Sequence, residues 1–471
     1  MFRNQYAISD ASLSGNISPD MEWHRMSIYL GEGAEVFAND NCIIIGKVVN
    51  SCDPSMSPND IADAVSSCDS IESVFELTDG MAGRYIIAFI INSEVYMLTD
   101  ACGFKRALFM RYNGAKIITS SENYAAHIFG FNIVINEDIK DMMRDESYRR
   151  KESPWFGLTS PDERFSYLIP NHYLYIGDFS LHRMPPPKIG GDVITSASSM
   201  IKNTILALSE RYKLIQPITA GIDSRILLAA SESVKDKIDY YVFGDENSNH
   251  EDVSVPKELA KIVGVNFNAI TPPSAPDEFK KKIEMTVLSG RDLPKIDNIY
   301  YHYKNSNFEK VNINGNGAEI FRSYYGASIL EFSAKSLSIL SGTKKWPIME
   351  RKIYDWLTLT EAKRFSQENN ISITDLFYWE QRMAIWGSMF PLEQDIAMDE
   401  VSPFSNRKLI FTMLSESSSK RRSPDFKSAT LLINFMDDRL NKVPVNPKSS
   451  NHIINFIKAH TITQLIVKKI I

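Results

Sequence analysis

The chain has 471 residues, of which 44% are hydrophobic and 23% are charged, and its formal net charge is −6. This length allows two or three domains with sizeable cores, and the composition is typical of a globular protein. The acidic balance disfavours a nucleic-acid-binding protein, which usually carries a basic surplus. No apolar run approaches the ~20 residues that span a bilayer, and the N-terminus lacks a hydrophobic signal core. We therefore expect no membrane span and a cytoplasmic location.

The first part of the chain, from about residue 25 to 135, is predicted to be rich in β-structure. Three segments combine β-branched and aromatic residues with turn signals at their ends: 42–49, 83–91 and 93–100. All four cysteines also lie in the first quarter of the chain: Cys42, Cys52, Cys68 and Cys102. Because they form no CxxC pair and have no His cluster beside them, a zinc site is not expected.

Residues 136–195 are interpreted as a connection between two domains. The charged run 144–151 is typical of a solvated helix face or linker, although its Arg149-Arg150-Lys151 stretch is also of a kind that contacts phosphate. The triplet Pro185-Pro186-Pro187 favours an extended segment at a domain boundary.

From residue 196 onward, helix and strand patterns alternate. The spacing of apolar residues predicts helices over 196–212, 255–264 and 277–290, and strands over 238–244, 266–271 and 310–315. This alternation predicts an α/β fold with a parallel sheet and right-handed crossovers. Ligands bind such sheets at the carboxyl ends of the strands. We therefore expect Thr219–Ser224, Phe243-Gly244 and Asn314–Glu319 to meet in one crevice.

The stretch from Leu214 to Ala230 has the order that a phosphate site needs. An apolar strand pattern ends in a turn of small residues, and a helix pattern begins at Asp223-Ser224. Small residues let the backbone approach phosphates, and the free N–H groups of a helix start point at the anion. From spacing alone, an ordinary capped βα turn explains the stretch about as well.

The segment TAGIDSR resembles the SGGxDS pyrophosphate loop of the asparagine synthetase family and its adenylate-forming relatives. The resemblance implies that nucleotide contacts come from six consecutive residues: Thr219, Ala220, Gly221, Ile222, Asp223 and Ser224. Thr219 keeps the hydroxyl of the family's first serine. Ala220 replaces a glycine, and its methyl group slightly crowds the loop.

A second segment, NINGNGAEIFRSYYG over 312–326, is similar to the family's GEGxDE loop. Gly315 and Gly317 hold the two glycine positions, and Glu319 falls where the family has a metal-binding aspartate. Asn316 and Ile320 replace the family's two glutamates. The resemblance implies a Mg²⁺ held by Asp223 and Glu319, and an adenine held by main-chain groups near Thr219 and Phe243-Gly244. On its own, the segment is more typical of a glycine-rich turn with a surface glutamate, and its place after a strand and downstream of TAGIDS favours the functional interpretation.

The N-terminal part, residues 1–135, resembles the glutaminase domain of the same family. The resemblance is carried by the turn Asp100–Gly103 and by the strand-like residues that follow it, Ala107–Phe109. Such a glutaminase uses a cysteine after the initiator Met as its nucleophile, but position 2 is Phe2 and no cysteine occurs before Cys42. We therefore expect a degenerate Ntn-glutaminase-like domain that is structural and not catalytic.

The family also implies residues for the amide-forming step. A lysine before a C-terminal helix stabilises the oxyanion, and Lys427 is the best match, with Lys442 as a weaker competitor. A partly buried glutamate recurs before an R-x-x-x-A helix, and Glu380 matches that position. For these residues an ordinary surface or structural role is at least as well supported by the sequence.

The leading hypothesis is an ATP-dependent, AMP-forming C–N ligase whose synthetase domain spans 196–471 and is adenine-nucleotide α-hydrolase-like. It adenylates the carboxylate of a small molecule, peptide or sugar, and an amine or ammonia then attacks. Ammonia would be free or supplied by a partner, and a homodimer is a further possible assembly. The alternative is a catalytically degenerate nucleotide-binding or scaffold protein of the same fold. Sulfur transfer to nucleic acid is disfavoured by the acidic charge and by the lack of a cysteine in the nucleotide region.

Overall fold

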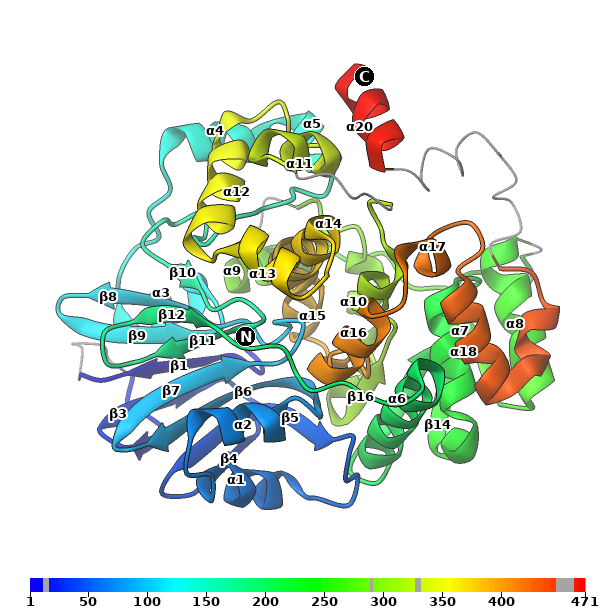
Figure 1. Ribbon diagram of the computed structural model, residues 1–471, viewed down its shortest axis with the longest axis horizontal. Helices are drawn as coiled ribbons and strands as arrows, with labels where there is room; N and C mark the ends of the chain where they lie inside the picture. The colour runs from blue at the N-terminus through cyan, green and yellow to red at the C-terminus, as the bar shows by residue number, and fades with distance from the viewer. Residues whose placement is uncertain (12–16, 249, 289–290, 327–331, 446–460, 471) are drawn as a thin grey trace.

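The computed structural model describes residues 1–11, 17–248, 250–288, 291–326, 332–445 and 461–470. These residues form a mixed α/β structure with three sheets. In Figure 1 the blue and cyan strands of the N-terminal part lie at the left, and the green helices of the middle part lie at the right. The yellow helices lie above them. None of the helices in the described part of the chain has the length and apolar character needed to cross a membrane.

Two six-stranded antiparallel sheets make up the N-terminal part. One has the order β10-β8-β9-β1-β3-β2: Ser166–Tyr167, Leu108–Tyr112, Ala115–Thr119, Tyr6–Ser9, Met26–Leu30 and Met21–Trp23. The other has the order β12-β11-β7-β6-β5-β4: Ser180–Arg183, His172–Tyr175, Glu94–Thr99, Met81–Ile91, Cys42–Asn50 and Val36–Ala38. The strands predicted over 42–49, 83–91 and 93–100 are confirmed as β5, β6 and β7. Residues 166–183, which the sequence assigns to the connection, add a strand to the first sheet and two to the second.

Alternating side chains pack these sheets into layers. Ile8 of β1 and Ile43 of β5 share a core between the two sheets. On the outer face of the second sheet, Ile44 packs with α1 (Pro58–Ser66) and α2 (Ile71–Thr78). Helix α3 (Glu122–Phe129) covers the outer face of the first sheet. The result is a helix–sheet–sheet–helix arrangement.

The third sheet is parallel and confirms the predicted α/β pattern. Its order is β15-β14-β13-β16-β17: Phe267–Ile270, Ile238–Phe243, Lys213–Pro217, Lys310–Ile313 and Asp399–Val401. The chain runs outward from β13 to β14 and β15, and then returns to the other side of β13 to form β16 and β17. The order therefore reverses between β13 and β16, which is the position where ligands bind in such sheets. No strand is predicted from the sequence at β17.

The helices predicted around this sheet are present and differ from the prediction only at their ends, whereas two further helical segments, over 232–237 and 296–304, are not predicted from the sequence. The whole set is α6 (Val193–Ser209), α7 (Ile222–Ala230), the short η1 (Glu232–Lys237), α8 (Glu251–Val263), α9 (Asp277–Thr286) and α10 (Ile296–Lys304). Helix α8 begins four residues before the predicted start, because His250 caps it and Pro256 is accommodated within it. Helix α9 ends at Thr286, and residues 289–290 lie outside the described part.

A helical block that the sequence analysis did not resolve lies between β16 and β17. It contains η3 (Ala318–Arg322), α11 (Ala334–Ser341), α12 (Pro347–Leu359), α13 (Ala362–Glu368), α14 (Ile373–Phe377), the π-helical η4 (Tyr378–Gly387) and α15 (Met389–Gln394). The short η2 (Asn307–Glu309) comes directly before β16. Helices α4 (Glu137–Arg144) and α5 (Glu146–Arg149) precede β10. The chain ends with α16 (Arg407–Leu414), α17 (Ser418–Arg421), α18 (Lys427–Asp437), η5 (Asp438–Lys442) and α20 (Thr461–Ile470).

Buried polar bonds join the N-terminal sheets to the later part of the chain. Arg84 of β6 makes a two-pronged ion pair with Asp395, with nitrogen–oxygen distances of 2.5 and 2.7 Å. The predicted turn at Asp100–Gly103 is present, and the Asp100 carboxylate accepts a 2.7 Å hydrogen bond from Ser405 Oγ. These bonds fix the parallel sheet against the N-terminal sheets. The domain boundaries at 135 and 195 stay predictions.

Candidate functional site

A cavity of about 630 Å³ lies where β13 and β16 end. It starts between the loops that follow these strands and continues along one face of the parallel sheet. Tyr241, Asn312 and Glu400 contribute to its floor from β14, β16 and β17. Helices α10 and α15 contribute side chains from the opposite side, including His302 and Glu393. The cavity therefore occupies the crevice that the strand order predicts.

The first loop is closed by hydrogen bonds between Thr219 and Ser224. Ser224 Oγ accepts from the Thr219 N–H at 3.1 Å, and the two side-chain hydroxyls lie 2.7 Å apart. Gly221 is the N-cap of α7 and supplies no side-chain cap. The first N–H groups of α7 thus have no capping side chain and are free to bind an anion, which the helix dipole also favours.

The second loop lies against the first. A Cβ atom at Gly315 would come within 3.0 Å of Asp223 Cβ, so only glycine allows this approach without displacement. Gly317 has φ +92°, a conformation that side-chain-bearing residues rarely adopt. The Glu319 carboxylate turns back and accepts a 3.0 Å hydrogen bond from the Gly317 N–H. Asp223 and Glu319 consequently face the same cavity.

Arg322 completes this cluster. Its guanidinium lies 3.0 Å from an Asp223 carboxylate oxygen and 3.7 Å from Glu319. Burial raises the pKa of Asp223 to about 7, against the lowering effect of Arg322 and with a further rise from Glu319. A second cation placed near Asp223 would therefore stabilise its ionised form.

The two acids fit a divalent cation that arrives with phosphates. Asp223 Oδ1 is buried and has no hydrogen-bond partner among the described residues. Within those residues no group of three or more His, Cys, Asp or Glu side chains is placed to hold a metal. Mg²⁺ is commonly held by one or two carboxylates together with substrate phosphates, and Asp223 with Glu319 matches that pattern.

Half of the predicted nucleotide-binding residues line this cavity, together with the predicted metal ligand Glu319. Those that line it are Thr219, Asp223, Ser224, Phe243, Gly315 and Glu319. The others lie in or beside the same loops without lining it: Ala220, Gly221, Ile222, Gly244 and Gly317. The side chains of Ala220 and Ile222 are buried in the core, which explains the apolar character of these two loop positions.

The residues predicted for the amide-forming step do not line the cavity. Glu380 is fully buried and is bound by Arg183 at 2.6 Å and by the Trp356 indole at 3.0 Å. Lys427 is exposed at the start of α18, and Lys442 is exposed at the end of η5. The geometry thus gives all three a structural or surface setting.

Cysteine placement differs from the expectation drawn from the sequence. Cys102 is far from the nucleotide loops along the chain, but a Cβ atom at Gly317 would lie only 3.1 Å from its Sγ. A cysteine therefore does lie against the second loop. Cys102 is fully buried, and burial raises the pKa of its thiol well above the usual value, which is typical of a cysteine that packs in a core.

Several cavity residues escaped the sequence analysis. The most informative are Lys295, Asn298 and His302 near or on α10, and Glu393 with Gln394 on α15. They come from segments without a motif, so no local signal identifies them. Arg322 could have been found, because it lies three residues after Glu319, within reach on one turn of helix.

No protein-family model and no curated protein matches the chain. Among solved structures, similarity is found to a glutamine phosphoribosylpyrophosphate amidotransferase from B. subtilis complexed with ADP and GMP. It is 8% identical, with 68% of this chain and 71% of that chain covered, at a TM-score of 0.23. A structure described as the allosteric regulatory enzyme of purine biosynthesis is 10% identical, with the same coverages, at a TM-score of 0.22. Scores this low carry no argument about fold or activity, so the family resemblance rests on the sequence motifs.

Proposed function

We propose that the chain is an ATP-dependent ligase of the asparagine synthetase type. It adenylates a carboxylate and transfers the acyl group to an amine or ammonia, with release of AMP and pyrophosphate. Its parallel-sheet part would be the pyrophosphate-loop domain, and its N-terminal sheets a degenerate glutaminase-like domain. One observation carries the proposal: Asp223 and Glu319, on loops that flank the switch point of the sheet, face one cavity beside the uncapped start of α7.

The chain's own groups suit a triphosphate. The first N–H groups of α7 would bind the β- and γ-phosphates, with the Thr219 hydroxyl beside them. Asp223 and Glu319 would hold Mg²⁺, which offsets phosphate charge when an anionic carboxylate approaches the α-phosphate. Arg322 would balance the charge of the two acids from outside the cavity lining. Phe243 would lie along the base end of the nucleotide.

The reaction then needs space for an acid and an amine. The acid's oxygen attacks the α-phosphorus, pyrophosphate leaves, and the amine displaces AMP from the acyl carbon. A cavity of about 630 Å³ is of the size that ligand sites occupy in proteins. Excluding water from this space would protect the acyl-adenylate from hydrolysis.

One observation favours the second candidate, a nucleotide-binding scaffold that has lost the amide step. The three residues that resemble the family's acyl-transfer groups, Glu380, Lys427 and Lys442, all lie outside the cavity lining. A scaffold would bind Mg²⁺–ATP without releasing AMP.

The test is calorimetric Mg²⁺–ATP binding by the wild type, Asp223→Ala and Gly221→Ala, with folding checked by circular dichroism. A Cβ at Gly221 meets only Thr219 Oγ1, at 3.4 Å, so Gly221→Ala should fold normally. Both variants should lose most of the affinity if phosphates approach this loop. Wild-type protein that fails to bind Mg²⁺–ATP, even with candidate carboxylates present, would reject ATP binding at this site. Binding without AMP release across carboxylate and amine panels would favour the scaffold.

A further inference from the structure

The cavity extends beyond the space that the phosphate loops need. We define the inner end of the cavity by five of the residues that line it: Asn298, Asn312, Glu393, Gln394 and Glu400. Asn312 and Glu400 are register partners within β16 and β17, so the inner end lies along these strands and not beyond the strand ends. The other three come from α10 and α15. None of them belongs to either nucleotide loop.

Two buried polar atoms at the inner end make no hydrogen bond to the described residues, and one of them, Glu393 Oε1, is in an ion pair with Arg291. Glu393 is 3% exposed and Gln394 is 7% exposed. Among the described residues, neither Glu393 Oε1 nor Gln394 Nε2 has a hydrogen-bond partner. Buried polar groups in proteins are almost always paired. A ligand that donates to Glu393 and accepts from Gln394 would satisfy both.

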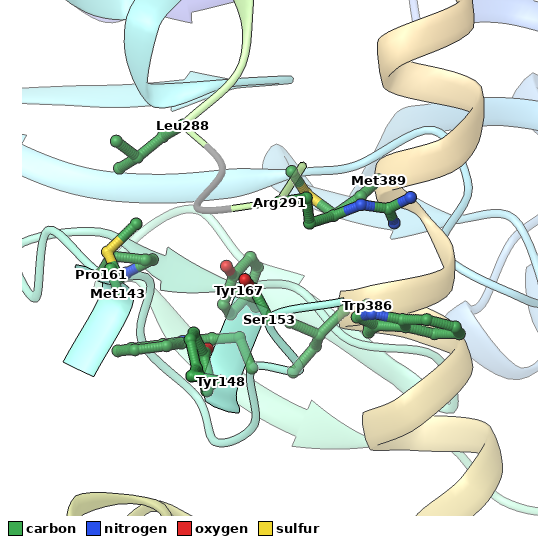
Figure 2. A pocket seen from close by; sticks show the side chains of 11 residues that line it. Met143, Tyr148, Ser153, Pro161, Tyr167, Leu288, Arg291, Trp386 and Met389 are labelled. Carbon is green, nitrogen blue, oxygen red and sulfur yellow. The ribbon is translucent and has the colours of Figure 1, made fainter. Parts of the chain in front are cut away.

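Glu393 is held from behind by a cation. Arg291 lies 3.3 Å from Glu393 Oε1, and its guanidinium lies 3.9 Å from the centre of the Phe390 ring. Figure 2 shows Arg291 reaching toward the helix that carries Trp386 and Met389. There it lines a separate small cavity of about 30 Å³. Arg291 thus fixes the carboxylate without entering the large cavity.

Glu400 adds a second carboxylate to the inner end. Its Oε1 accepts a 3.0 Å hydrogen bond from Asn312 Nδ2, and Asn312 Oδ1 accepts in turn from Tyr241 OH at 3.2 Å. Burial raises the pKa of both Glu393 and Glu400, although Lys295 lowers each. Lys295 itself is exposed, with its Nζ 4.8 Å from the centre of the Phe390 ring. A cation inside the cavity would favour the charged form of both acids.

We infer that the inner end binds the ammonium group of an organic amine, held by Glu393 and Glu400, while an oxygen of the same molecule accepts from Gln394 Nε2. Ammonium ion alone would satisfy the acids but would leave Gln394 unpaired. The inner end therefore selects an amine with a nearby hydroxyl, carbonyl or carboxylate oxygen. Its assignment as the amine substrate of the ligase rests on the proposed function.

The probe is ethanolamine, which carries an ammonium group and a hydroxyl two carbons apart. Binding is measured by saturation-transfer NMR at millimolar ligand, without nucleotide, with ethylene glycol as the uncharged counterpart. Glu393→Gln and Glu400→Gln remove one charge each from the inner end. Asp252→Asn is the matched control, because this carboxylate lines the same cavity but its side chain is 77% exposed.

Wild type and Asp252→Asn should bind ethanolamine equally, and ethylene glycol should not bind. Each glutamine variant should bind roughly tenfold more weakly or worse, as expected for loss of a charged hydrogen bond. Glu400→Gln keeps Arg291 paired, so it remains informative where Glu393→Gln fails to fold. Absence of wild-type binding, or a folded Glu400→Gln that binds as Asp252→Asn does, overturns the inference. Calorimetry with Mg²⁺–ATP on the same samples separates this result from failure of the proposed function.

Discussion

Arg322 lies 3.0 Å from the Asp223 carboxylate, in the position of a counter-ion for the acid predicted to hold a metal. The pair leaves Asp223 Oδ1 without a hydrogen bond among the described residues. The same guanidinium is 3.7 Å from Glu319 and 5.8 Å from the centre of the Phe426 ring. In the ligand-free protein, one arginine therefore balances both acids.

Replacing Arg322 with an uncharged residue should strengthen cation binding, whereas general disruption of the site would weaken it. Arg322→Gln frees the acids from a competing cation, so Mn²⁺ should bind the nucleotide-free protein more tightly, by roughly fivefold for a partly exposed ion pair. Arg322→Lys retains the competition and should bind Mn²⁺ as the wild type does. Electron paramagnetic resonance of free Mn²⁺ measures both. Equal affinities in all three proteins would show that Asp223 and Glu319 are not a cation site.

The close approach of the two loops should make Gly315 intolerant of a side chain. Gly315→Ala places a methyl group 3.0 Å from Asp223 Cβ, so the loops must separate. We expect a loss of about 1–3 kcal/mol in unfolding free energy, as for other overpacked sites, together with weaker Mg²⁺–ATP binding. Gly190→Ala is the control, because nothing lies within 4 Å of a Cβ there. Denaturant unfolding measures the stability and calorimetry measures the binding. Equal unfolding free energies and equal Mg²⁺–ATP affinities in the two variants would contradict the close approach of the loops.

Glu380 should be important for stability and not for chemistry. Its carboxylate is the partner of the Arg183 guanidinium in a buried setting, so Glu380→Gln leaves Arg183 without its counter-ion. Breaking such a pair typically costs about 3–5 kcal/mol, measurable by urea unfolding. Lys427→Met, at an exposed position, should change stability by less than about 0.5 kcal/mol. A Glu380→Gln protein of normal stability that lacks ligase turnover would restore the catalytic assignment.

His302 should make the fold sensitive to acid. Burial lowers the pKa of His302 from 6.5 to about 4, with a smaller effect from Lys310, and Asn307 lies 3.0 Å from its Nδ1. The unfolded chain therefore binds more protons between these pH values, so this contribution is complete above pH 6.5 and is lost as pH falls toward 4.

The full loss from His302 would approach about 3 kcal/mol. Unfolding free energies measured across this range should fall less steeply in His302→Gln than in the wild type. His172, whose pKa burial also lowers to about 4, should leave part of the slope in place. An unchanged slope in His302→Gln would contradict the assignment of a neutral buried imidazole.

Local patterns in the sequence predicted six strands, β5, β6, β7, β14, β15 and β16, and four helices, α6, α7, α8 and α9. Period-two and continuous apolar runs predicted β5, β6 and β14, because buried strands need them whatever the rest of the chain does. The motif order predicted the first loop correctly as a strand–turn–helix junction. The helix ends differ from the apolar pattern, as at α8, where the His250 cap places the start at Glu251.

Only the tertiary structure decided which side chains share the cavity. Asp223 and Glu319 meet because β13 and β16 are neighbours, and Glu393 and Glu400 join them through α15 and β17, well over a hundred residues from the first loop. It also placed Cys102 behind the second loop and removed Glu380, Lys427 and Lys442 from the cavity lining. The periodicity of apolar residues indicates which face of each segment is buried. The pairing of distant segments depends on the strand order and packing of the whole chain, which no local pattern contains.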